Sequence, residues 1–321
     1  MGGLRRMRTA ALLLGVLLAA AGCGGGGGGG GGDAGFGASS SAADQGTVTI
    51  AAQNFTGGKV MSQLYAQLLE SKGYDTDIKL VGTRDLYMPE LQSGRVQLVP
   101  EYLAGIADFL NTAANGQNAK PISTSDPQGT LDALRPLTDK AGITMLQPAQ
   151  ASDQNAFFVT QERADAEALV TLSDLADLGE PITLAAPPDC EGRDDCEKGL
   201  TEVYGFEVAD ILPTEFGSTQ TKDAVTKGEA DLGETGTTDG SLEELGLVLL
   251  EDDKGIQPAQ NLTPAVNTEW FTDHSDVAEM LNDFSAQFTT EDLAAMTLQV
   301  DVDRADPADV AEEYLSGKGL I

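Results

Sequence analysis

Strand-like and helix-like patterns alternate along residues 47–321, and this alternation restricts the chain to α/β folds more strongly than any single motif. A strand is predicted over 47–50, and the helix after it carries an apolar stripe from Val60 to Leu69. Further strands are expected at 75–80, 96–99, 182–185 and 247–250, and further helices at 84–92, 218–226, 276–288, 290–296 and 307–316. This order is typical of helices layered on largely parallel sheets, so we predict an α/β fold.

One short pattern occurs twice. Residues 93–98 (Ser-Gly-Arg-Val-Gln-Leu) recur in kind as residues 227–232 (Lys-Gly-Glu-Ala-Asp-Leu). In each, a glycine closes a helix, a short strand follows, and a loop begins at the carboxyl end of that strand. Ligands bind at this edge of open α/β sheets. Two such edges in two lobes would face one another across a cleft, although helix–glycine–strand is also common in α/β proteins generally.

The N-terminal segment has the pattern of an export signal. Three arginines within the first eight residues precede an apolar run over 10–21, which is too short to span a bilayer. The tetrapeptide 20–23, Ala-Ala-Gly-Cys, resembles the lipobox of bacterial lipoproteins, in which the cysteine is lipidated and becomes the new N-terminus. We therefore expect a signal peptide over 1–22 and lipidation of Cys23. The alternative is an ordinary secreted protein cut near Ala21, with a free cysteine.

Residues 23–46 are expected to form a tether. Nine consecutive glycines follow Cys23, and the rest of the segment is glycine, serine, alanine and aspartate with one glutamine and a single aromatic residue. Such a segment has no apolar surface to bury and should remain a flexible coil, with a root-mean-square span of roughly 25–30 Å. It would hold a folded body at the outer face of the cell membrane, with the lipid as its one membrane contact.

Charge excludes some classes of partner. The formal net charge of the chain is -32, so its surface will not attract nucleic acid or anionic lipid. Two explanations stay open, which are solubility outside the cell and attraction of a cationic ligand. Residues 47–321 are enough for two lobes of ordinary domain size.

Cys190 and Cys196 stand in a short polar loop with no histidine beside them. In an oxidising compartment a disulfide that closes this loop is favoured, and two free thiols are the alternative. A zinc site would need two more nitrogen or sulfur ligands, and the sequence has one histidine, His274. We therefore expect neither a metal nor another cofactor.

Several short segments carry a family resemblance in the same order along the chain. They are Asn54-Phe55-Thr56, Gly82-Thr83-Arg84, Pro100-Glu101-Tyr102, Thr237-Thr238-Asp239-Gly240, and residues 249–254 and 299–302. Together they resemble the glycine betaine/choline/carnitine-binding proteins of ABC importers, over nearly all of 47–321.

The resemblance implies a two-lobed, periplasmic-binding-protein-like fold with a ligand cleft between the lobes. Such a protein closes on a quaternary amine and delivers it to an ABC permease with its ATPase, and we expect a monomer. The chain would cross between the lobes twice, near Asp153 and Gln257. Lobe 1 would then comprise 47–152 plus 258–321, and lobe 2 would comprise 153–257.

The chemistry of a quaternary amine defines the candidate residues. A trimethylammonium group has no N–H donor and is held by aromatic faces, whereas a carboxylate or hydroxyl end needs Arg, Thr, Asn or backbone N–H groups. Tyr102 is the first candidate for an aromatic cage, followed by Phe55 and Tyr87. Arg84, at a predicted helix start, could meet a ligand carboxylate. Each has a structural alternative, namely packing for the aromatic residues and an ion pair with Asp85 or Glu90 for Arg84.

The second lobe departs from the family pattern. Where cage aromatics are expected, this chain has Ala156 and Gly236. Either Phe157 or Phe158 could substitute, but adjacent residues on a strand point in opposite directions. A carboxylate could instead hold a cationic ligand, or the ligand could be a more polar osmolyte. The full set of predicted ligand-binding residues is Asn54, Phe55, Thr56, Arg84, Tyr87, Glu101, Tyr102, Asp153, Asn155, Phe157, Thr237, Thr238 and Asp239, with Glu101, Asp153 and Asp239 as the carboxylates.

An enzyme is not expected. A hydrolase triad needs a histidine held by a carboxylate, and His274 lies in a polar segment without a Gly-x-Ser-x-Gly motif. The chain has few aromatic residues for a sugar platform. The favoured interpretation is therefore a binding protein of an importer. A sensor lipoprotein on the same scaffold, or a different polar or cationic ligand, stays open.

Overall fold

The computed structural model describes residues 46–321. The predicted signal peptide, Cys23 and the predicted tether up to residue 45 lie outside this part. The described residues belong to one compact unit, and none of their helices is long and apolar enough to cross a membrane.

The first sheet has five strands in the order β2-β1-β3-β10-β4. Its strands are β1 (Thr47–Gln53), β2 (Asp75–Val81), β3 (Leu98–Tyr102), β4 (Ile143–Met145) and β10 (Leu262–Asn267). Every residue of β10 is buried, because this strand lies between two neighbours and both faces of the sheet are covered. The strand predicted at 96–99 begins two residues later than expected and extends to Tyr102.

The second sheet repeats this arrangement in the order β7-β6-β8-β5-β9. Its strands are β5 (Asn155–Thr160), β6 (Ile182–Ala186), β7 (Val208–Pro213), β8 (Leu232–Gly236) and β9 (Leu247–Leu250). The repeated sequence pattern falls at equivalent places, because Gly94 and Gly228 both adopt positive φ after a helix and lead into the central strands β3 and β8. The two sheet edges expected from this repeat therefore exist.

The expectation of largely parallel sheets is wrong, because both sheets are mixed. In the first, β1 pairs in parallel with β2 and β3, whereas β10 is antiparallel to β3 and β4. In the second, β6 is parallel to β7 and β8, whereas β5 is antiparallel to β8 and β9. The antiparallel strands β5 and β10 are those at which the chain arrives from the other sheet. Parallel neighbours are joined by a helical crossover within one sheet. Among the described residues no such crossover leads into β5 or β10, because each follows a strand of the other sheet.

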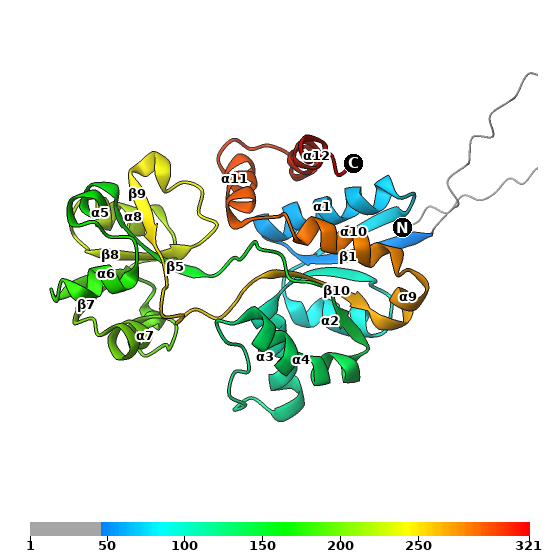
Figure 1. The fold of residues 1–321 in the computed structure, drawn as a ribbon, viewed down its shortest axis with the longest axis horizontal. Helices are drawn as coiled ribbons and strands as arrows, with labels where there is room; N and C mark the ends of the chain where they lie inside the picture. Colours follow the sequence, from blue (N-terminus) through cyan, green and yellow to red (C-terminus); the bar gives the residue numbers. More distant parts are fainter. Residues whose placement is uncertain (1–45) are drawn as a thin grey trace, which may run out of the picture. The chain divides into compact units, whose positions relative to one another are not determined.

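Helices cover both faces of each sheet (Figure 1). On the first sheet, α1, α10, α11 and α12 pack on one face, and α2, α3 and α4 pack on the other. The bounds are α1 (Thr56–Ser71), α2 (Arg84–Gln92), α3 (Leu103–Asn115), α4 (Pro127–Ala141), α9 (Thr268–Asp273), α10 (Asp276–Ser285), α11 (Thr290–Asp301) and α12 (Pro307–Lys318). On the second sheet they are α5 (Gln161–Glu167), α6 (Leu172–Asp177), α7 (Glu197–Gly199) and α8 (Thr219–Thr226). Three further short helical turns span Pro188–Cys190, Leu200–Tyr204 and Glu243–Leu245.

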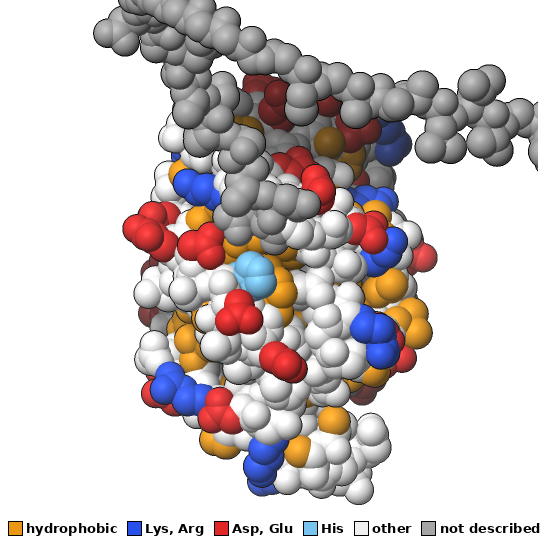
Figure 2. Space-filling view, turned by 90° about the vertical axis from the view of Figure 1, so that its right-hand side faces the viewer, with side chains coloured by type: hydrophobic (Ala, Val, Ile, Leu, Met, Phe, Trp, Pro, Cys, Tyr) orange, Lys and Arg blue, Asp and Glu red, His pale blue; other side chains and the backbone are white. Residues whose placement is uncertain are grey.

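Charged side chains of both signs lie on the surface of the protein. On the face that carries the one histidine, acidic and basic side chains lie interspersed (Figure 2). Several exposed basic side chains pair with nearby acids, as in Lys79–Asp77, Arg135–Asp132 and Lys227–Asp223. Exposed pairs of this kind contribute little to stability.

Candidate functional site

A cavity of about 500 Å³ is lined by residues that follow β1 of the first sheet, by residues in and around the second sheet, and by residues of α11. The residues around it come from the loops at the carboxyl ends of β1, β7 and β8, from the segment before β5, and from α8 and α11. They are Phe55, Thr56, Gly57, Asp153, Phe216, Gly217, Lys222, Thr235, Gly236, Thr238, Asp239, Gly240, Ser241, Thr297, Leu298, Asp301 and Val302. Loops after strand ends dominate this set, as expected for a ligand site in α/β sheets.

Phe55 contributes an aromatic face from the first sheet. It directly follows the turn after β1 and is the N-cap residue of α1, where its extended backbone turns the side chain out of the helix. Its side chain is 38% exposed, although it is large and apolar. Tyr102 lies behind it, with the two ring centroids 5.8 Å apart. The Tyr102 hydroxyl is buried and has no hydrogen-bond partner among the described residues.

Phe216 contributes a second aromatic face, from the loop between β7 and α8. Its side chain is 47% exposed. A Cβ atom built on Gly236 would lie 3.8 Å from the Phe216 ring and 3.6 Å from Oδ1 of Asp153. The absence of a side chain at position 236 therefore leaves space where an aromatic ring and a carboxylate converge. Position 236 therefore lacks the aromatic residue that the family pattern leads one to expect, and the ring of Phe216 lies beside it.

Asp153 supplies the carboxylate beside the space at Gly236. Its Oδ1 accepts a hydrogen bond of 2.7 Å from Oγ1 of Thr238, and it has no basic partner among the ion pairs of the described residues. Burial raises the pKa of Asp153, although the Thr238 hydroxyl acts in the opposite direction. A cation next to this carboxylate would favour its charged form.

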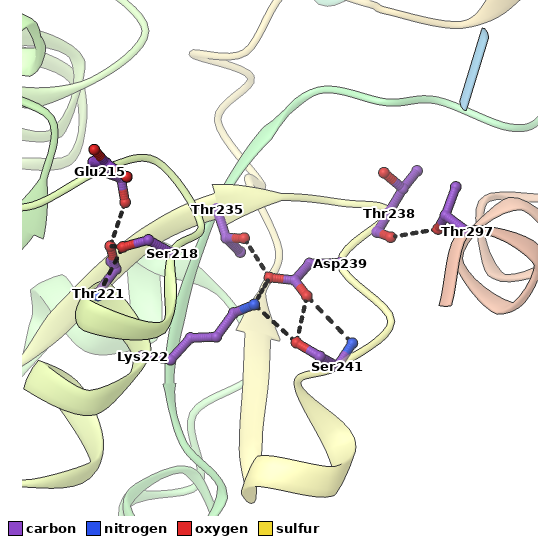
Figure 3. A network of polar contacts seen from close by, with 9 residues as sticks. All are labelled: Glu215, Ser218, Thr221, Lys222, Thr235, Thr238, Asp239, Ser241 and Thr297. Carbon is purple, nitrogen blue, oxygen red and sulfur yellow. Dashed lines mark hydrogen bonds and ion pairs between the residues drawn. The ribbon is translucent and has the colours of Figure 1, made fainter. Parts of the chain in front are cut away.

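A polar network holds the loop after β8 (Figure 3). Lys222, buried on α8, places Nζ 2.7 Å from Oδ2 of Asp239 and 2.8 Å from Oγ of Ser241. Thr235 donates to Asp239 at 2.6 Å, and the Ser241 hydroxyl donates to the same carboxylate at 2.7 Å. Although burial alone would raise it, these bonds hold the pKa of Asp239 below its usual value. Asp239 is therefore a charged group that the protein itself neutralises.

Helix α11 contacts the same loop from the C-terminal segment. Oγ1 of Thr297 donates to the carbonyl of Thr238 at 3.2 Å (Figure 3). A Cβ atom on Gly240 would come within 2.7 Å of the Ala294 carbonyl, so the loop approaches the helix closely only because residue 240 is glycine. At the end of α11, Asp301 accepts a bond of 2.6 Å from Thr56.

Arg84, Tyr87 and Glu101 come together, but away from the cavity lining. The Glu101 carboxylate is fully buried and accepts bonds from Nε and Nη2 of Arg84 and a bond of 2.7 Å from the Tyr87 hydroxyl. The alternative of an ion pair with Asp85 or Glu90 is wrong, because α2 and β3 place Glu101 within 3.0 Å of Arg84. Contact between Arg84 and a ligand carboxylate stays a prediction. Tyr87 packs in the core below α2.

Five other predicted residues also lie outside the cavity lining, and one of them is Tyr102, the first cage candidate, whose ring lies next to that of Phe55. Asn54 is exposed at the turn after β1, where its backbone N–H bonds to Val81. Asn155 donates to Asp195, and the Thr237 hydroxyl donates to the Ser152 carbonyl. Phe157 packs in the core of the second sheet, because its position on β5 points it toward the disulfide face. Phe158 lies on the opposite face of the sheet, against Gly233.

Cys190 and Cys196 form a disulfide, which is buried in the same core. A carboxylate oxygen of Glu234 and the two sulfurs lie within 4.8 Å of one another, which is the spacing of metal ligands. Both sulfurs are already bonded to each other, so they cannot serve as the thiolates that a metal would need. Neither oxygen of Glu234 has a hydrogen-bond partner among the described residues.

Sequence reasoning missed Phe216 and Lys222. Phe216 had one available signal, since an aromatic residue followed by glycine stands in the loop before a predicted helix. Lys222 had none, because its role depends on the position of Asp239 after a different strand. Phe55, Thr56, Asp153, Thr238 and Asp239 are the predicted residues that line the cavity.

Comparisons with known proteins identify the family of this chain. Residues 46–317 match the family model described as the substrate binding domain of the ABC-type glycine betaine transport system. A glycine-betaine-binding protein from Pseudomonas aeruginosa is 25% identical over 294 residues, covering 88% of this chain and 91% of the relative. The carnitine transport binding protein OpuCC of Listeria monocytogenes is 24% identical over 287 residues and covers 88% of both chains.

Solved structures give the same result for the fold. Apo YehZ from Escherichia coli superposes with a TM-score of 0.74 at 25% identity, covering 86% of this chain and 99% of that structure. Lactococcal OpuAC, in its closed conformation with glycine betaine, has a TM-score of 0.53 at 12% identity and covers 85% of this chain and 96% of its own. The predicted periplasmic-binding-protein-like fold is therefore confirmed, as is the expectation of a binding protein in place of an enzyme. This chain belongs to the family of substrate-binding domains of ABC-type glycine betaine transport systems.

Proposed function

We propose that this protein binds a quaternary amine, such as glycine betaine, choline or carnitine, and delivers it to an ABC permease with its ATPase. The observation that carries the proposal is the pair of exposed aromatic side chains, Phe55 and Phe216, on one cavity beside the carboxylate of Asp153. Aromatic faces attract a diffuse cation that lacks N–H donors, at about 0.5–2 kcal/mol per ring. The relatives named for glycine betaine and carnitine support the same ligand class.

The ligand would lie against Phe55, Phe216 and Asp153, with Thr238 and Thr56 at its polar end. Tyr102 would support Phe55 from behind, because its ring lies 5.8 Å from that of Phe55. Arg84, Tyr87 and Glu101 would then brace the carboxyl end of β3 without ligand contact.

The proposal also covers the division into two lobes, their closure on the ligand and the attachment of the protein to the membrane. We place the chain crossings near Asp153 and Gln257, which divides the protein into lobe 1 (47–152 plus 258–321) and lobe 2 (153–257). Ligand contacts from both lobes would favour a closed state, which docks on the permease. Removal of a signal peptide over 1–22 and lipidation of Cys23 would hold a monomer at the outer face of the membrane, on the tether formed by 23–46.

Titration calorimetry of residues 46–321 with choline, glycine betaine and carnitine tests the proposal. We expect saturable binding of at least one of them. Phe216→Ala and Phe55→Ala should each weaken it by about two- to thirtyfold, because each removes one cation–π contact. Leu245→Ala is the matched control, since it truncates an exposed apolar side chain outside the cavity and should leave the affinity unchanged. Absence of heat with all three compounds would refute the quaternary-amine assignment.

A further inference from the structure

The charges around the cavity do not balance. Three carboxylates line it, those of Asp153, Asp239 and Asp301, against one ammonium group, that of Lys222. A cavity of this kind carries a net charge of two negative among its lining residues when all four groups are ionised. A zwitterion brings no net charge into this negatively charged cavity, whereas a cation brings a positive charge that the lining carboxylates attract.

Two of the three acids that sequence reasoning singled out are already neutralised by the protein. Glu101 pairs with Arg84 at 3.0 Å and accepts a bond from Tyr87, so the charge of that guanidinium is already balanced within the protein. Asp239 pairs with Lys222 at 2.7 Å, and the same ammonium group also donates to Ser241. Both basic side chains that could meet the acidic end of a zwitterion are therefore paired with acids of the protein, Glu101 being buried and Asp239 partly buried.

Asp153 is the exception among these acids. Its partner is the Thr238 hydroxyl, which cannot neutralise it, and its Oδ1 faces the vacant position at Gly236 next to Phe216. A trimethylammonium group placed against Phe216 would therefore meet a carboxylate that has no other counter-ion. On the rim, Asp301 is exposed and bonds only to the Thr56 hydroxyl among the hydrogen bonds of the described residues.

We propose that Asp153 makes the site selective for a net cation, a hydroxyl-bearing quaternary amine, over zwitterionic betaines. This inference rests on the proposed function, since it names the charge class of ligand for the same cavity. The hydroxyl end of such a cation would find Thr56, Thr235, Thr238 and Ser241 on the cavity wall. The selectivity is electrostatic, so removal of the Asp153 charge without change of shape should remove most of it.

The test compares three compounds of nearly equal shape on the full chain, purified in nonionic detergent. Choline is the cation, glycine betaine is the zwitterion, and the uncharged analogue of choline has carbon in place of nitrogen. We expect choline to bind at least about tenfold more tightly than either of the others, given the strength of a close charge pair in a partly buried site. Asp153→Asn, which preserves Oδ1 for Thr238, should remove most of this preference.

Asp303→Asn is the matched control. It removes the same charge from an exposed position two residues beyond Asp301, outside the cavity lining, and should leave the preference for choline intact. Glycine betaine bound as tightly as choline, or an unchanged preference in Asp153→Asn, would overturn the inference while the proposed function stood. Failure of choline, glycine betaine and carnitine alike to bind would overturn both.

Discussion

Glu234 is a single residue whose ionisation should be visible in the stability of the whole protein. It lies on β8 opposite Phe157 of β5, so its side chain enters the core that contains the disulfide. The side chain has no exposed surface, and both carboxylate oxygens lack hydrogen-bond partners among the described residues. An unpaired buried carboxylate is costly, so burial favours the protonated form of this group.

Burial raises the pKa of Glu234 from 4.5 to about 7. Arg193 lowers it, whereas Asp195 and Asp189 raise it further. Because the folded-state pKa lies above the unfolded one, the folded protein holds this proton more tightly. The associated stability is present below pH 4.5 and is lost as the pH rises through about 7. We expect a loss of about 3 kcal/mol in the free energy of unfolding from this residue across that window.

Urea unfolding between pH 5 and pH 8 measures this effect, with wild type compared to Glu234→Gln. The variant carries no titratable group at this position, so its stability should vary less with pH over this window than that of wild type. Glu243→Gln changes an exposed carboxylate near β9 and serves as the control, with a pH dependence like that of wild type. If Glu234→Gln declined as steeply as wild type, the buried carboxylate would not be the group that titrates.

At the scale of elements, the segment between β6 and β7 depends on its disulfide. It contains only short helical turns and α7, and the bond between Cys190 and Cys196 closes a loop with a sequence separation of 6. Closure of so short a loop removes conformations from the unfolded chain, which corresponds to about 2 kcal/mol in the chain-entropy model.

Replacement of both cysteines by alanine should therefore lower the free energy of unfolding by about 2 kcal/mol or more, because two buried sulfurs are also lost. Chemical denaturation with and without a dithiol reductant provides the measurement. Reductant should destabilise wild type and leave the double variant unaffected. Equal stability of the two proteins under oxidising conditions would show that the loop is held by its packing alone.

The elements also indicate how far sequence reasoning reaches. Helix α2 is predicted with its exact bounds, and the glycines that lead into β3 and β8 identify both central strands, because these signals are local. The antiparallel strands β5 and β10 escape such reasoning, since strand direction depends on where the chain crosses between sheets. Among the residues that line the cavity, Phe55 and Asp153 could be predicted from the sequence of their own loops. Phe216 could not, because the space beside its ring lies at Gly236, which belongs to another segment.

At the scale of the whole molecule, the proposed function requires that ligand binding draws two lobes together. Phe55 and Thr56 follow β1 of the first sheet, whereas Phe216 and Gly236 belong to the second, so a ligand that contacts both sets favours the conformation in which they are close. The size of the shift is set by the difference in affinity between the open and closed states.

Small-angle scattering of residues 46–321 should therefore give a smaller radius of gyration when choline saturates the protein. Phe55→Ala combined with Phe216→Ala provides the control, because at the same choline concentration this variant should stay unliganded and keep the larger radius. Calorimetry on the same samples establishes saturation, which separates weak binding from binding without movement. Identical scattering profiles for free and saturated wild type would mean that the aromatic side chains of both sheets already lie at their bound positions. Recognition would then occur on a preformed site, and the permease would have to distinguish the loaded protein by the ligand-contacting loops alone.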